Sequence, residues 1–299
     1  MRLCRYTDNQ LGEDQLGLVR DDMLFDATAA LENLPPLTWP IPQGDHLIAN
    51  LDVLRPAIEH AADDSHPVPV DSVVLKSPVA NPSKIIGAPV NYQKHHDEAV
   101  ADQEINLGRD VKTIDTYGLF MKANSSLVGP GEGVALRFPD RRNDHEVELA
   151  VIIGEGGSDI AEADAMRHIC AYAIGLDMTV RGTEDRSLRK GIDTYSVLGP
   201  WLVTADEIAD PGHLDFEIRV NDEVRQKSNT EHLIFDIPRL IAYASSFMTL
   251  YPGDVVMTGT PEGVGPVEPG DVMHAWIDGV GTMSVPVRAH DEDVRLTFQ

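Results

Sequence analysis

The stretch Asp144-His145-Glu146-Val147-Glu148 runs directly into the apolar segment Leu149-Ala150-Val151-Ile152-Ile153. Such a segment predicts a buried β-strand, and the side chains of a strand alternate between its two faces. Glu146 and Glu148 would then point the same way, ~7 Å apart along the strand, and His145 would point to the other face. Carboxylates that close raise one another's pKa or bind a cation. The alternative is an exposed, polar start to a buried strand, which is a common place for charged residues.

The composition excludes several classes of partner. The 299 residues include 24 Lys and Arg against 49 Asp and Glu, a net charge of -25. This charge repels nucleic acid and anionic lipid, so an anionic substrate would need local positive charge from a metal ion or a few basic residues. No apolar run approaches about eighteen residues and residues 1–6 do not form a secretory signal, so we expect a cytoplasmic protein without membrane contact. Two cysteines, Cys4 and Cys170, do not make a disulfide framework.

The chain divides into two regions by pattern. Residues 1–75 predict a small N-terminal domain, with short strands separated by turns and a helix over 47–54 that breaks near Pro56 and could resume to His60. A segment with two prolines at 64–70 is typical of a linker. Residues 76–299 would form the main domain.

His95 and Glu98 follow a short predicted strand at 84–87. On a helical turn they are neighbours at i and i+3, so the carboxylate could orient the imidazole as a general base. A solvated pair on a loop is the alternative interpretation. The polar segment 99–117 that follows has the character of a lid or a disordered loop, which could carry the base to a substrate.

A third carboxylate, Asp177, ends the predicted strand 172–176. Basic residues then gather in this otherwise acidic chain, at Arg181, Arg186, Arg189 and Lys190. Ordinary surface ion pairs would explain each base alone, whereas the group suits an anionic ligand held against a metal ion.

The C-terminal half predicts further regular structure. A strand at 214–220 leads into a turn at Asn221-Asp222, and Asp236 with Pro238 begins a helix. The glycines of the segment 259–265 permit positive φ and close backbone approach. That segment lacks the Lys-Ser/Thr of a phosphate-binding Walker motif.

In these residues the chain resembles the fumarylacetoacetate hydrolase (FAH) family, including its bacterial acylpyruvate and fumarylpyruvate hydrolases and its 2-hydroxyhepta-2,4-diene-1,7-dioate isomerases. Six motifs carry the resemblance in the family's order: Asn91 to Glu98, Phe120 to Ser126, Asp144 to Leu149, Asp177 with Arg181, Lys190 to Thr194, and Pro252 to Gly265. Residues 1–75 resemble only the family's variable N-terminal portion.

The resemblance implies an α+β fold, a rolled barrel or sandwich of mostly antiparallel strands with few helices. It also implies a divalent ion held by Glu146, Glu148 and Asp177. A set of oxygen ligands suits a hard ion, Mg²⁺ first, with Mn²⁺ or Ca²⁺ possible. The resemblance points further to a homodimer.

The implied reaction is hydrolysis of a C–C bond in a 2,4-dioxo acid of acylpyruvate type through a metal-stabilised enolate. By carry-over from the family's motifs, His95 oriented by Glu98 would activate water and Lys190 would stabilise the enolate. Arg181 and Lys122 would hold carboxylate groups, and Thr260 would donate a hydrogen bond to the substrate.

One short segment departs from the family's pattern. Relatives commonly carry Asp and then Gln where this chain has Gly182 and Glu184, the second of which belongs to the expected substrate-binding set. A carboxylate there would repel an anionic intermediate unless it pairs with Arg181 or Arg186, so either it turns outward or the reaction differs. Isomerisation of an unsaturated dioic 2-oxo acid and decarboxylation of oxaloacetate remain alternatives at the same metal site. A metal-binding protein without catalysis is a third.

Overall fold

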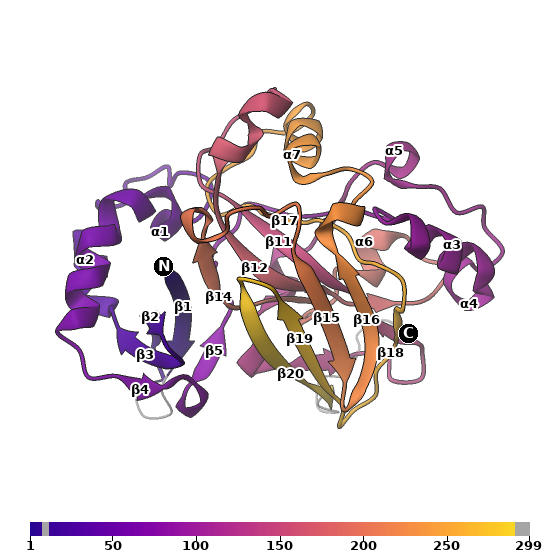
Figure 1. Ribbon diagram of the computed structural model, residues 1–299, viewed down its shortest axis with the longest axis horizontal. Helices are drawn as coiled ribbons and strands as arrows, with labels where there is room; N and C mark the ends of the chain where they lie inside the picture. Colours follow the sequence, from indigo (N-terminus) through magenta and orange to yellow (C-terminus); the bar gives the residue numbers. More distant parts are fainter. Residues whose placement is uncertain (8–11, 291–299) are drawn as a thin grey trace.

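The computed structural model describes residues 1–7 and 12–290, and its central feature is a mixed sheet of 12 strands (Figure 1). Two of the twelve strands lie off the main path: β5 (Val74–Lys76) pairs with β1, and β8 (Leu127–Val128) pairs with β14. The path through the other ten strands is β4 (Val68–Pro69), β3 (Met23–Asp26), β2 (Asp14–Arg20), β1 (Arg2–Thr7), β14 (Ser196–Thr204), β12 (Ile169–Asp177), β11 (Val147–Ile153), β17 (Val255–Met257), β6 (Ile85–Gly87) and β7 (Phe120–Lys122).

The opening stretch supplies the middle of this sheet. Strand β11 is buried along its whole length because both of its faces are covered. Leu149 and Val151 join one hydrophobic cluster, whereas Ala150 and Ile152 join a second cluster on the opposite face. Alternate residues of β11 therefore face two separate hydrophobic cores. The predicted α+β fold of mostly antiparallel strands is confirmed.

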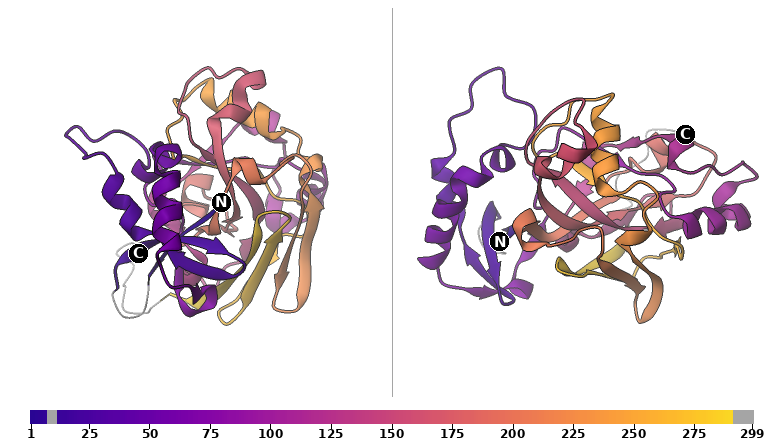
Figure 2. Two further views of the ribbon diagram at one scale, coloured as in Figure 1. Left: turned by 60° about the vertical axis from the view of Figure 1, so that its left-hand side comes forward. Right: turned by 45° about the horizontal axis from the view of Figure 1, so that its top comes forward.

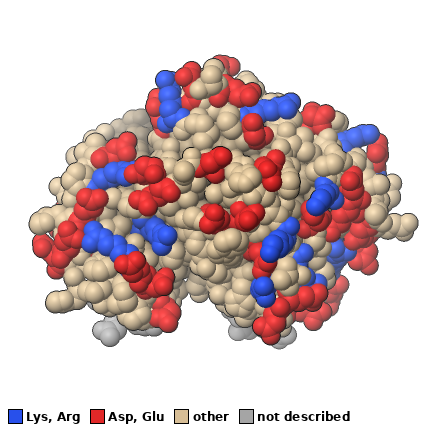
Figure 3. Space-filling view, viewed as in Figure 1, with Lys and Arg blue, Asp and Glu red and all other residues tan. Residues whose placement is uncertain are grey.

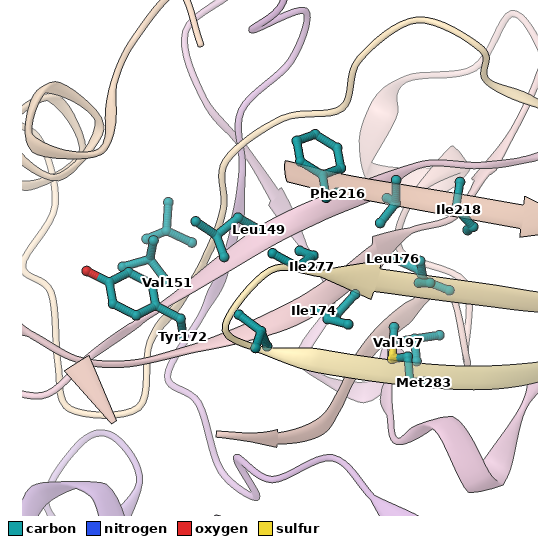
Figure 4. Packing of buried hydrophobic residues seen from close by; sticks show 14 of the residues in the cluster. Leu149, Val151, Tyr172, Ile174, Leu176, Val197, Phe216, Ile218, Ile277 and Met283 are labelled. Atoms are coloured by element: carbon teal, nitrogen blue, oxygen red, sulfur yellow. The ribbon is translucent and has the colours of Figure 1, made fainter. Parts of the chain in front are cut away.

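A sheet of five strands packs over the first of these clusters (Figure 4). Phe216 and Ile218 of this sheet belong to the same buried cluster as Leu149, Ile174 and Leu176 of the large sheet. The five strands, in order, are β16 (Glu223–Asn229), β15 (Asp215–Val220), β19 (Val272–Ile277), β20 (Gly281–Ala289) and β9 (Val134–Leu136). A small sheet of β13 (Thr179–Val180), β10 (Asn143–His145) and β18 (Gly265–Pro266) lies beside the site.

The N-terminal region shares the large sheet, since β1 pairs with β14. Its helices α1 (His46–Ala49) and α2 (Leu51–Asp63) cover strands β1 to β3 (Figure 2). The predicted break at Pro56 is wrong: α2 continues through it. Proline removes a single helical hydrogen bond, and α2 buries Leu51, Leu54 and Ile58 against the sheet in compensation.

Among the described residues, four short helices lie near the metal site that the sequence predicts. Segment 99–117, predicted as a lid or disordered loop, contains the end of α3 (Gln93–Ala101) and the helical turns α4 (Gln103–Asn106) and α5 (Ile114–Tyr117). Helix α6 (Arg186–Arg189) comes later in the chain. As predicted, Asp236 caps α7 (Ile237–Ser245) by accepting from Arg239 N, and Asn221, with φ of 55°, forms the β15–β16 turn.

Acidic side chains are spread widely over the face shown in Figure 3, with fewer basic ones between them. Within the described residues, no helix is both long and apolar enough to cross a bilayer.

Candidate metal centre and active site

Three carboxylates meet at one end of β11 and β12. Glu146 lies between β10 and β11, Glu148 lies on β11, and Asp177 ends β12. The two strands are antiparallel neighbours, with Val147 opposite Leu176, which brings the start of one to the end of the other. One ligand atom from each residue lies within 4.8 Å of the other two, and all three residues are buried.

The electrostatics of this cluster suit a cation. Burial, reinforced by the negative charges of Asp177 and Glu146, raises the pKa of Glu148 well above its usual value. Burial also opposes ionisation of Glu146, but Lys190 and Arg181 outweigh it and lower the pKa of that carboxyl. A buried set of oxygen donors with a deficit of positive charge fits a hard divalent ion.

Basic side chains surround the carboxylates. The Lys190 ammonium donates to Glu146 Oε2 at 2.7 Å and to Asp177 Oδ2 at 2.6 Å. Arg181 donates to Glu146 Oε1 at 3.1 Å and to Asp144 Oδ2 at 2.7 Å. Both bases line the same cavity as the carboxylates.

Lys122 differs from the role expected for it. Its ammonium is fully buried and donates to Asp177 Oδ1, and the residue is not part of the cavity wall. Burial lowers the pKa of Lys122, so the ammonium needs the adjacent carboxylate as a counter-charge. It therefore faces Asp177 and not a substrate carboxylate.

His95 and Glu98 are held together on α3. His95 Nδ1 lies 3.1 Å from Glu98 Oε2, and His95 lines the cavity that contains the three carboxylates. Glu98 Oε1 in turn accepts the Gly263 N–H at 2.8 Å. If Nδ1 carries the proton toward Glu98, then Nε2 is the basic nitrogen, which is the arrangement of an oriented general base.

The loop between β17 and β18 supports both sides of the site. Gly259 N donates to Glu148 Oε2 at 2.7 Å, while Gly263 N donates to Glu98. Both glycines have positive φ, +107° and +92°, and a Cβ at Gly263 would lie 2.0 Å from Arg225 O. The close backbone approach predicted for this segment thus brings two backbone amides to two carboxylates.

Thr260 lies in this loop and lines the cavity, but its hydroxyl proton is donated to a protein group. Its hydroxyl donates to Val147 O at 2.9 Å and accepts from Gln226 Nε2 at 2.8 Å. A hydroxyl has one proton, so the expected donation to substrate would require this bond to break.

Glu184 pairs with neither Arg181 nor Arg186, the two expected partners. Its carboxylate accepts from Arg141 Nη1 at 3.0 Å and Nη2 at 2.8 Å, and Glu184 does not line the cavity. Arg181 does not pair with Glu184 because its guanidinium binds Asp144 and Glu146. The residue has turned outward, as one of the two alternatives required.

Gln226 was missed from the sequence. Its side-chain oxygen accepts Val147 N at 3.0 Å and lies 3.2 Å from His145 Nδ1. Its amide nitrogen donates to Thr260 and to Pro261 O. Gln226 therefore connects β16 to β11 and is a hydrogen-bond partner of His145, which faces away from the carboxylate cluster. Nothing in the pattern around residue 226 indicates this contact.

Buried oxygen ligands beside an oriented histidine and several bases are typical of enzymes that use a divalent metal ion on small anionic substrates. The chain belongs to the fumarylacetoacetate hydrolase family: the model described as fumarylacetoacetate (FAA) hydrolase C-terminal matches residues 84–288. The resemblance seen in the sequence is thus confirmed.

Individual relatives are similar over nearly the whole chain. Maleylpyruvate hydrolase of Aquipseudomonas alcaligenes is 50% identical, covering 97% of this chain and 100% of that protein. The crystal structure of maleylpyruvate hydrolase from Sphingobium sp. SYK-6 with manganese(II) and pyruvate is 42% identical, with a TM-score of 0.80, covering 97% of this chain and 100% of that one. The mitochondrial oxaloacetate tautomerase fahd2 of Xenopus laevis is 34% identical, covering 96% and 90%.

Proposed function

We propose that this protein is a metal-dependent hydrolase that cleaves a C–C bond of a 2,4-dioxo acid, with maleylpyruvate and fumarylpyruvate as the first substrates to test. The observation that carries the proposal is one cavity that contains both the three-carboxylate cluster and the His95–Glu98 pair. The similarity to two maleylpyruvate hydrolases supports the choice of substrates.

Glu146, Glu148 and Asp177 would hold the metal ion. We propose Mg²⁺ as the physiological ion with Mn²⁺ as a competent substitute, because the ligands are all oxygens and the Sphingobium relative contains manganese. When bound, the ion would supply a Lewis acid for the 2-oxo acid end of the substrate.

The protein's own residues account for the proton transfers. His95 Nε2 takes a proton from water, and the resulting hydroxide attacks the C4 carbonyl. The C3–C4 bond then breaks, with its electron pair going to C3, and yields a carboxylic acid, which releases its proton to solvent, and the enolate of pyruvate. Lys190 and Arg181, which line the cavity, lower the energy of the negative charge that develops. The imidazolium returns its proton to C3, which restores His95.

A tautomerase or isomerase is the second candidate function, favoured by the similarity to oxaloacetate tautomerase. Decarboxylation of oxaloacetate uses the same electrostatics. None of these reactions needs water activated for attack on a carbonyl. A metal-binding protein without catalysis would have no use for the His95–Glu98 pair.

Replacement of His95 separates these candidates. For His95→Ala, we expect kcat on acylpyruvates to fall on the order of 10²–10⁴-fold, because no base remains to activate water, while oxaloacetate decarboxylation should fall less. His96→Ala is the matched control, since His96 is the next residue on α3 and does not line the cavity. Wild-type rates in the His95 variant would refute the mechanism.

A homodimer and a cytoplasmic location stay predictions. The mass in solution by light scattering tests the first.

A further inference from the structure

Three more arginines line the cavity of the metal centre. Arg186 and Arg189 lie on α6, and Arg109 lies on the 99–117 segment. Within the described residues none of the three forms an ion pair with a carboxylate, and their partners are neutral groups. This is unusual in a chain with 49 acidic residues against 24 Lys and Arg.

Arg189 is positioned by a single backbone contact. Its Nε donates to the carbonyl of Glu184 at 2.9 Å, and its Nη groups have no protein partner in the part of the chain that the structure describes. The side chain is half-buried. Burial, together with the positive charges of Arg181 and Arg186, lowers the pKa of Arg189, so the guanidinium lies where an anion would be stabilised.

The other two arginines are held in a similar way. The Arg186 guanidinium lies 4.3 Å from the centroid of the Tyr117 ring, and Arg109 Nη2 donates to Thr183 O at 2.6 Å. Stacking and backbone contacts fix a guanidinium and leave its charge uncompensated.

The nearest candidate counter-charge is occupied elsewhere. Glu184 is adjacent to this group in sequence, but Arg141 binds both of its carboxylate oxygens. The other two bases of the cavity are already paired. Lys190 pairs with Glu146 and Asp177. Arg181 pairs with Glu146 and Asp144. The cavity thus contains two bases that are paired with carboxylates, Lys190 and Arg181, and a group of three arginines that form no ion pair within the described residues.

We propose that Arg189 and Arg186, assisted by Arg109, form a second anion subsite that binds the distal carboxylate of a dicarboxylic 2-oxo acid. The inference rests on the proposed function, which places the 2-oxo acid end of the substrate at the metal centre. Planar guanidinium groups with free Nη donors match a carboxylate. The subsite selects substrates whose acyl part ends in a second carboxylate, such as maleyl or fumaryl groups, over simple acylpyruvates.

Binding of unreactive ligands tests this without turnover. Calorimetry on the Mn²⁺-loaded full-length protein compares 2-oxo dicarboxylic acids of five to seven carbons with 2-oxo monocarboxylic acids of equal length. We expect the wild type to bind the best dicarboxylate at least tenfold more tightly than its monocarboxylate counterpart. In Arg189→Gln this ratio should fall about tenfold or more, as for loss of a charge-assisted hydrogen bond.

Arg167→Gln is the control, because it removes one positive charge from an exposed side chain outside this cavity. It should keep the wild-type ratio. The subsite is refuted if the wild type does not favour dicarboxylates, if it binds no 2-oxo acid, or if Arg189→Gln weakens both series equally. Failure of acylpyruvate cleavage alone would overturn the proposed reaction and leave this binding comparison standing.

Discussion

Lys122 and Lys190 carry the same charge beside the same carboxylate, yet only Lys190 reaches the cavity. Both donate to Asp177, one to each oxygen. Lys122 is fully buried and is not part of the cavity lining, whereas Lys190 lines the cavity and also contacts Glu146. The number of bases near a site is thus a poor guide to how many meet a ligand, since each buried ammonium first needs a counter-charge.

The two cysteines give a residue-scale prediction. Burial raises the pKa of Cys4 and of Cys170 to about 12, from an ordinary 9.0. A raised pKa leaves less thiolate at any pH below it, so at pH 8 the thiolate fraction falls on the order of 10³-fold. Cys4 is 1% exposed, whereas Cys170 is half-buried. We therefore expect the Cys4 thiol to resist a disulfide reagent in the native protein and to react after unfolding in guanidinium. Rapid native reaction of Cys4 would contradict this.

At the scale of elements, the loop between β17 and β18 connects the three-carboxylate cluster to the His95–Glu98 pair. Its amides at Gly259 and Gly263 bind Glu148 and Glu98, which lie on different elements, β11 and α3. The relative position of the carboxylate cluster and the histidine therefore depends on this backbone, and a small shift in it would misplace the base.

Gly263→Ala tests this connection. Its φ of +92° is strained for alanine, and the new Cβ would meet Arg225 O at 2.0 Å, so the loop must move. We expect a loss of about 1–3 kcal/mol in the free energy of unfolding and a clear fall in kcat/KM. Gly270→Ala is the matched control, with φ of +102° and no atom within 4 Å of the new Cβ. Equal effects of the two substitutions on kcat/KM would argue against the connection.

At the scale of the whole molecule, the predicted small domain at 1–75 shares a sheet and a core with the rest. Leu3 on β1 is opposite Leu202 on β14, and both belong to the cluster that contains Ala150 and Ile152. A shared core favours cooperative unfolding of the two regions. The division into domains stays a prediction.

Leu3→Ala tests cooperativity. Leu3 is 2% exposed, so its truncation should cost about 2–5 kcal/mol. If the regions unfold together, calorimetry should show one transition, shifted as a whole, and activity should be lost at the same temperature. Leu37→Ala, at a side chain 47% exposed, is the control and should change stability by no more than about 0.5 kcal/mol. Two transitions, with only one shifted, would support an independent N-terminal domain.

The sequence by itself determined the central strand, the carboxylate trio, the His95–Glu98 pair and the family, because these depend on local spacing and on short motifs. The tertiary structure decided which charges are paired. Glu184 binds Arg141, Lys122 is buried beside Asp177, Thr260 gives its proton to Val147 O, and Gln226 reaches the site from β16. Each of these outcomes depends on contacts between residues far apart in the chain. Burial leads most polar groups to find a partner, and the local sequence pattern does not indicate which residue that partner is.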